Sequence, residues 1–120
     1  MSEINQHEIQ WSAETEQSVL WAIQNRCQGK ERAMTRKVIA TDLEIPLRVL
    51  RSIVRTLNAR GIPILPSNSG YYYATNPDEI DRVALRYHAM GVNNIEHSRY
   101  LKTIARKIRE RSQIVIKGVG

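Results

Sequence analysis

Several features are scarce in this 120-residue chain, and each shortage excludes a class of protein. Cys27 is the single cysteine, so the chain can form neither an internal disulfide nor a zinc site built on several cysteines. Met1–Gln10 is polar and slightly acidic, unlike a signal peptide. The longest strongly apolar run, residues 19–23, is far shorter than the roughly 20 residues that a membrane span needs. We therefore expect a cytoplasmic protein in a reducing compartment.

The residue patterns of common enzymes are also missing. His7, His88 and His97 share no metal-ligand spacing with one another or with Cys27. The sequence has no Gly-rich phosphate loop, no nucleophile elbow and no HExxH motif. The acids within residues 78–81 fit the first turn of a helix, near the positive end of its dipole, better than a paired-carboxylate site. We expect no enzyme activity, no cofactor and no bound metal.

Positive charge is present in excess and lies mainly in two segments. The net charge is +6. Residues 35–61 carry six bases and two acids, and residues 97–120 carry seven bases and one acid. The other segments are neutral or slightly acidic. A basic segment on one element indicates a polyanionic partner, and a solvated helix face is the ordinary alternative.

Apolar residues at helical spacing predict three helices in the first half of the chain. The first begins at the cap Ser12 and ends at Gly29; the second has Thr35 as its N-cap. The third has Pro46 in its first turn and Gly61 just past its end. The inward faces of the second and third helices are predicted from Val38, Ile39, Leu43, Leu50, Ile53, Val54 and Leu57.

A hairpin and further helices are predicted after residue 61. Apolar residues 62–65, a turn around residues 67–70 and three tyrosines indicate two short strands. Asn76 and Pro77 then begin a helix, whose predicted inward face comprises Ile80, Val83, Ala84, Tyr87 and Met90. Gly91 either breaks or bends this segment. The last helix is expected to end near Arg111, before a frayed tail.

Most of the unusual side chains are expected to pack rather than to react. Cys27 fits a small core residue better than a reactive thiol. Trp11 and Trp21 are expected to anchor the core. Residues 71–73 are tyrosines, for which packing is favoured over stacking on nucleic-acid bases, because at least one face of the strand must cover the core.

The second and third predicted helices match a known pattern at several positions. Ala40 lies where the third helix would cross the second, Ile45 follows the turn, and Leu50 and Ile53 lie on the buried side. This spacing resembles the signature of the helix-turn-helix family. The sequence departs from the signature at Glu44, which stands where the turn often has glycine.

The hairpin extends the resemblance. Over roughly residues 15–75 the chain resembles the winged helix-turn-helix family, with residues 61–74 as the wing. The end of that wing, Gly70-Tyr71-Tyr72, is similar to that of biotin-repressor-type DNA-binding domains. Small phage or bacterial proteins of regulation and replication are similar too. The resemblance implies an α+β, mostly α fold and a third helix that enters the major groove of DNA.

The residues of the predicted third helix agree with that implication. Arg48, Ser52 and Arg55 form one outward stripe, with Arg51 beside it and no acid on that face. A solvated helix face is the alternative. Two further contacts with phosphate are expected, at the start of the second helix and at the wing tip, although an ordinary cap and a polar turn explain these residues equally well. The candidate DNA-binding residues are Thr35, Arg36, Lys37, Leu47, Arg48, Arg51, Ser52, Arg55, Ser67 and Asn68.

The sequence thus predicts a sequence-specific double-stranded DNA-binding protein that acts in transcription regulation or replication initiation. The alternative is a protein–protein adaptor built on a winged-helix scaffold, and a weaker one is an RNA-binding protein that uses the basic C-terminal helix. The expected organisation is a lead-in over 1–12, the winged domain over 13–75, a helical extension over 76–112 and a tail over 113–120. A heptad-like apolar stripe in residues 77–111 predicts a homodimer or, alternatively, packing on the first helix.

Overall fold

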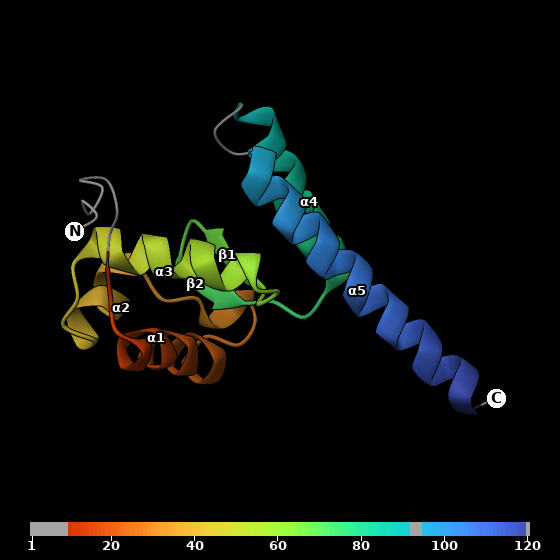
Figure 1. Cartoon of the computed structure of the whole chain (residues 1–120), viewed down its shortest axis with the longest axis horizontal. Coiled ribbons are helices and arrows are strands. Elements are labelled where there is room, and N and C mark those ends of the chain that lie inside the picture. The colour runs from red at the N-terminus through yellow and green to blue at the C-terminus, as the bar shows by residue number, and fades with distance from the viewer. Residues whose placement is uncertain (1–9, 92–94, 120) are drawn as a thin grey trace, which may run out of the picture.

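The computed structural model describes residues 10–91 and 95–119, with side chains up to Ser112. These residues form an α+β, mostly helical fold with five α-helices, one short 3-10 helix and a two-stranded antiparallel sheet (Figure 1). The elements follow in the order α1 (Ala13–Arg26), η1 (Lys30–Arg32), α2 (Arg36–Asp42), α3 (Leu47–Ala59), β1 (Ile64–Ser67), β2 (Gly70–Tyr73), α4 (Pro77–Ala89) and α5 (Ile95–Val119). Of the predicted lead-in, residues 1–9 lie outside the described part.

The predicted caps begin the first two helices. The Ser12 hydroxyl accepts a hydrogen bond from the backbone N–H of Thr15, and the Thr35 hydroxyl accepts one from Val38. Each bond satisfies one donor that the first helical turn leaves without a partner. Cys27 ends α1 with its side chain buried, and burial raises the pKa of its thiol. The core role predicted for Cys27 is thus confirmed.

A tight turn joins α2 to α3. The Ile45 N–H donates to the Ala40 carbonyl and the Glu44 N–H donates to the Thr41 carbonyl, which satisfies two carbonyls at the end of α2. This is the Schellman pattern, and it requires a left-handed residue just past the helix, here Glu44 with φ 56°. Ile39 and Ala40 are buried on α2. The tight turn lays α2 across α3, whose buried residues are Leu50, Ile53, Val54, Leu57 and Asn58.

Four details differ from the sequence predictions. Val38 was predicted to face inward, but it is 45% exposed on the outer side of the short helix α2. Trp21 was predicted to anchor the core and is 57% exposed, with Arg26 over its ring. Met90 is exposed because α4 ends before it. Pro46 is the N-cap of α3 rather than a residue of its first turn.

The β1–β2 hairpin packs against the segment that joins α1 to α2. Ser67 pairs with Gly70 at its tip, as the turn residues predicted. On the other edge of β2, Met34 exchanges two backbone hydrogen bonds with Tyr71. Gly70 is essential to this approach, because a Cβ at its position would lie 1.8 Å from the Met34 carbonyl oxygen. Tyr71 and Tyr72 are buried and Tyr73 is half-buried, so packing accounts for all three.

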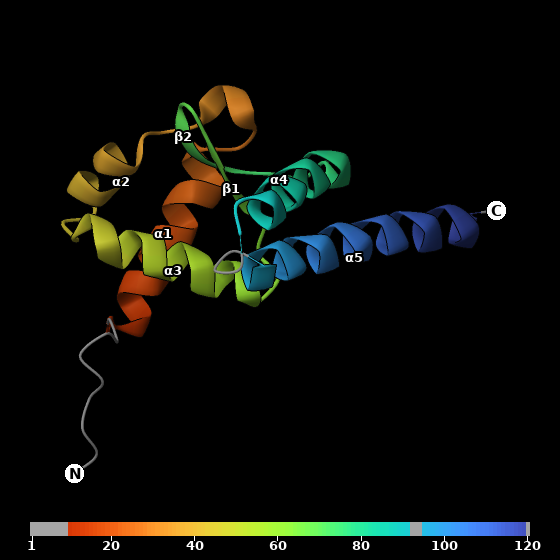
Figure 2. The same cartoon turned by 90° about the horizontal axis from the view of Figure 1, so that it is seen from above.

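The chain reverses direction near Gly91. Helix α4 ends at Ala89, and Gly91 has a φ of +122°, so the segment is broken rather than bent. Helices α4 and α5 lie side by side and run in opposite directions (Figure 1 and Figure 2). They pack on the end of α3 and on β1, and the core therefore includes Ile80, Val83, Ala84, Leu101, Ile104 and Ala105.

Helix α5 is longer than predicted, because its backbone stays helical to Val119 through the segment predicted to be a frayed tail. Its last turns extend beyond the rest of the molecule (Figure 1). The apolar stripe that predicted a dimer is largely buried within one chain. It packs α4 and α5 mainly on α3 and β1, and not on the first helix α1 as the alternative predicted. The homodimer stays a prediction, and it would need a surface other than this stripe. No helix among the described residues combines the length and hydropathy needed to cross a membrane.

Candidate nucleic-acid interface

The solvent side of α3 carries three arginines. Arg48, Arg51 and Arg55 are exposed, while the opposite side of the helix is buried against α1, α2 and the hairpin. The predicted outward stripe is therefore present. Ser52 is half-buried within it, and Leu47, at the start of α3, is 36% exposed. This face can present several guanidinium groups to a polyanion at once.

Helix α2 packs against α3, and its first turn adds two further bases, Arg36 and Lys37. Lys37 and the N-cap residue Thr35 are both exposed. The Thr35 hydroxyl already accepts a hydrogen bond from the Val38 N–H. Arg36 is half-buried, and its guanidinium lies over the Tyr71 ring at 5.1 Å from the ring centre. Its Nε is buried and has no hydrogen-bond partner among the described residues. The stack on Tyr71 fixes the direction in which this arginine points.

Two tyrosine hydroxyls respond to the charges of this face. Burial raises the pKa of Tyr71, and the positive charges of Arg36 and Arg51 oppose that rise. Burial likewise raises the pKa of Tyr87 on α4. Three arginines oppose the rise at Tyr87, one each from α2, α3 and α4: Arg36, Arg55 and Arg86. The structure therefore brings charges from distant parts of the sequence close to one another.

The hairpin tip presents the exposed polar residues Asn68 and Ser69. The Ser67 hydroxyl donates to the Gly70 carbonyl at 2.9 Å and accepts from the Ser69 N–H at 3.1 Å. Both bonds hold the turn in shape. Of the two predicted contact residues at the tip, Ser67 is thus engaged within the turn and Asn68 faces solvent.

The far end of α3 is tied to α5 by a buried hydrogen-bond network. The Asn58 amide nitrogen donates to the Ile62 and Ile64 carbonyls at 2.7 and 3.2 Å. Its amide oxygen then accepts from Nε2 of His97 on α5. The His97 ring also stacks on Tyr87, with ring centres 4.4 Å apart. Burial, with a smaller effect from Arg55, lowers the pKa of His97 to about 4, so the ring is neutral near pH 7.

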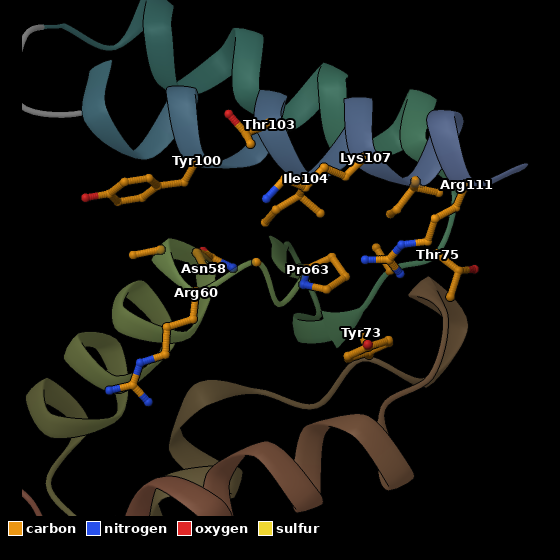
Figure 3. A pocket seen from close by; sticks show the side chains of 14 residues that line it. Asn58, Arg60, Pro63, Tyr73, Thr75, Tyr100, Thr103, Ile104, Lys107 and Arg111 are labelled. Atoms are coloured by element: carbon orange, nitrogen blue, oxygen red, sulfur yellow. The ribbon is translucent and has the colours of Figure 1, made fainter. Parts of the chain in front are cut away.

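A hollow of about 450 Å³ separates α5 from the end of α3 and the base of the hairpin. Figure 3 shows Tyr100, Thr103 and Lys107 of α5 on one side and Asn58, Pro63 and Tyr73 on the other. The guanidinium of Arg60 points away from it and pairs with Glu16 of α1. Arg111 is a further base in its lining, and no acid of the described part of the chain lines it. Its wall therefore suits anions better than cations.

Potential metal ligands do not gather in the part of the chain that the structure describes. Within residues 10–91 and 95–119, no three His, Cys, Asp or Glu side chains lie close enough together to hold a metal ion. The site is thus an arrangement of cations, hydroxyls and one amide, which can bind an anion by charge and hydrogen bonds.

Comparison with known proteins adds no relative. No family model matches the chain, and searches of curated proteins and of solved structures return no match either.

Sequence reasoning missed two parts of this site. Asn58 and His97 are 39 residues apart, and neither has a sequence pattern that indicates its partner. The bases of α4 were overlooked because the segment around them is acidic overall. Arg82 and Arg86 are one helical turn apart, and this spacing indicates that both lie on one side of the helix.

Proposed function

We propose that the protein binds double-stranded DNA in a sequence-specific way, in transcription regulation or in replication initiation. Residues 13–75 are then a winged helix-turn-helix domain, with β1 and β2 as the wing. The observation that carries the proposal is the exposure of Arg48, Arg51 and Arg55 along one side of α3, directly after the tight turn from α2.

The dimensions of α3 fit this role. Its 13 residues span about 20 Å, and a helix of this kind enters the major groove of B-DNA, which is about 12 Å wide. Arginine can form two parallel hydrogen bonds to guanine O6 and N7, or bind phosphate. Arg51 and Arg55 lie one turn apart, so both can reach the same groove. The neighbouring Arg36 and Lys37 then contact backbone phosphates.

The adaptor alternative requires apolar side chains among these arginines, since protein interfaces have a largely uncharged centre. Leu47 is the large apolar residue exposed on α3 in the described structure, and Val38 is the one exposed on α2. Two such residues among several cations make a poor protein-binding surface. The DNA-binding proposal therefore accounts better for this face.

The decisive experiment selects bound duplexes from a random pool and then measures the affinity of the full chain for the selected and the random duplexes. The α3 triple variant combines Arg48→Ala, Arg51→Ala and Arg55→Ala. Each arginine that contacts a base contributes about 1–3 kcal/mol, so this variant should lose both affinity and sequence preference. Its circular dichroism should stay unchanged, because the three side chains are exposed.

A matched control separates this effect from net charge. The α5 triple variant combines Arg99→Ala, Lys102→Ala and Arg106→Ala, which are exposed and remove the same charge from another helix. It should keep the sequence preference. Equal behaviour of the two variants would contradict the role of α3. Loss of RNA binding in the α5 triple variant, with no duplex binding by the parent chain, would favour the RNA alternative.

A further inference from the structure

The wing tip carries no charge of its own, but bases from two other elements lie beside it. Residues 62–76 contain no charged side chain. A hollow of about 330 Å³ nevertheless opens next to the tip, with residues 66–69 on one side. Its other walls carry Lys30 of η1 and both Arg82 and Arg86 of α4. Helix α4 packs against β1 and η1 against β2, so the two elements flank the hairpin.

These three bases are available to a partner. All three side chains are exposed, and among the described residues none lies within 4.0 Å of a carboxylate. Arg109 of α5 is different, because it pairs with Asp78 and Asp81 at 2.7 and 2.6 Å. One acid, Glu79, lines the same hollow, so three bases and one acid leave a net charge of +2.

Bases from more than one element approach the wing. Arg36 leans on Tyr71, which belongs to the wing. The charges of Arg36, Arg55 and Arg86 all oppose the rise in the pKa of Tyr87, so bases from α2, α3 and α4 act on one hydroxyl. The wing therefore has a base of α2 on Tyr71 and bases of η1 and α4 beside its uncharged tip.

Phosphate is the chemistry that this cluster fits. Arg82 and Arg86 lie about 6 Å apart along the α4 axis, on the same side of the helix, and can reach one stretch of sugar–phosphate backbone. The hollow is open and polar, and three bases against one acid favour an anionic group there. Contacts of this type fix a protein on a duplex without reading its sequence.

We propose that Lys30, Arg82 and Arg86, the wing-side cluster, hold the backbone of the DNA whose major groove receives α3. The cluster then supplies from α4 and η1 the charge that the wing lacks. This inference rests on the proposed function and extends the DNA contact beyond the winged domain to the helical extension.

The test compares the full chain with a cluster variant, Lys30→Ala with Arg82→Ala and Arg86→Ala, over a series of salt concentrations. Each lost phosphate contact lowers the slope of log K against log salt by about 0.9. The cluster variant should therefore lose two to three units of slope, and its affinity for selected and random duplexes should fall by the same factor, about tenfold or more. The ratio between the two affinities should not change.

Two controls sharpen the test. The α5 triple variant removes the same charge and should change the slope by less than one unit. A conservative variant, Arg82→Lys with Arg86→Lys, keeps the charges and should retain most of the slope. Ethylation interference should locate phosphates, next to the groove that α3 occupies, whose effect disappears in the cluster variant.

Several outcomes would overturn the inference. If the cluster variant and the α5 triple variant lose equal affinity and slope, the effect comes from long-range charge alone and not from phosphate contacts of the cluster. A changed ratio between selected and random duplexes would mean contact with bases. If the cluster variant binds like the parent while the α3 triple variant does not, the inference fails and the proposed function stands. If the parent chain binds no duplex, both fail.

Discussion

Glu44 has a backbone conformation that residues other than glycine seldom adopt. Its φ of 56° places it in the left-handed region, where a Cβ approaches the backbone carbonyl. The hydrogen bonds from Ile45 to Ala40 and from Glu44 to Thr41 hold it there. The cost of this conformation is about 1–2 kcal/mol, and the turn between α2 and α3 tolerates it because the flanking helices fix its ends.

The first prediction tests this strain. Glu44→Gly removes the Cβ and should raise the free energy of unfolding by about 0.5–1 kcal/mol, since the greater freedom of glycine in the unfolded chain offsets part of the gain. Denaturant unfolding measures the change. Glu44→Ala is the control, because it removes the exposed carboxylate and keeps the Cβ, and it should give no gain. An equal effect of both substitutions would mean that the change comes from the loss of the carboxylate and not from the loss of the Cβ.

At the scale of elements, one network joins α3 to the C-terminal hairpin of α4 and α5. The Asn58 amide hydrogen-bonds both to the backbone after α3 and to the His97 ring. Tyr87 stacks on that ring. Because the amide nitrogen of Asn58 donates to carbonyls, its oxygen must accept, and the N–H of His97 Nε2 must donate. A neutral His97 with its proton on Nε2 satisfies the network.

This network predicts how stability depends on pH. The pKa of His97 is about 4 in the folded chain and near 6.5 when unfolded. The stabilisation is complete above pH 6.5 and is lost as the pH falls toward 4, because the unfolded chain then takes up the proton first. Between pH 7 and pH 5 we expect the free energy of unfolding to decrease by about 1–2 kcal/mol.

Two substitutions separate His97 from other titrating groups. His97→Gln keeps a donor toward Asn58 without a titrating ring, so its stability should change less between pH 7 and pH 5. His88, exposed at the end of α4, supplies the control, and His88→Gln should keep the full dependence. Denaturant midpoints across this range measure both variants. A parental pH dependence in His97→Gln would exclude His97 as its source.

At the scale of the whole molecule, the winged unit and the helical extension share one core. Buried side chains of α4 and α5 belong to the same cluster as those of α1, α3 and the hairpin. Removing the extension would expose apolar surface on α3 and β1, where it packs. We therefore expect the boundary predicted near residue 75 to mark a change of element and not an independent folding unit.

Truncation tests this shared core. A chain that ends at Thr75 should melt at a much lower temperature than the full chain, or fail to unfold cooperatively, because it loses Ile80, Leu101 and Ile104 from the core. A chain that ends at Ser112 is the matched control and should keep the parental melting temperature. Thermal unfolding followed by circular dichroism measures both. An unchanged melting temperature in the shorter chain would show two independent cores.

Local patterns in the sequence were sufficient for most elements. The caps Ser12, Thr35 and Asn76 begin their helices, and Gly61 stands just past the end of α3. Such positions are predictable because a cap or a left-handed glycine depends on a few neighbouring residues. The predictions that Val38 and Trp21 are buried were wrong because burial does not depend on neighbouring residues alone. Helical spacing gives an apolar face, but what covers that face depends on elements far away in the sequence.

The sequence by itself determined the outward arginines of α3, since helix periodicity puts them opposite a strongly apolar face. It also determined the absence of charge from the wing. Only the tertiary structure decided that Lys30, Arg82 and Arg86 lie beside that wing and that His97 meets Asn58. Asn58 and His97 are 39 positions apart along the chain, and Lys30 and Arg82 are 52 positions apart. These contacts exist because α4 and α5 bury their apolar sides on α3 and β1. Packing of that kind follows from the shapes of several elements together, which no local pattern contains.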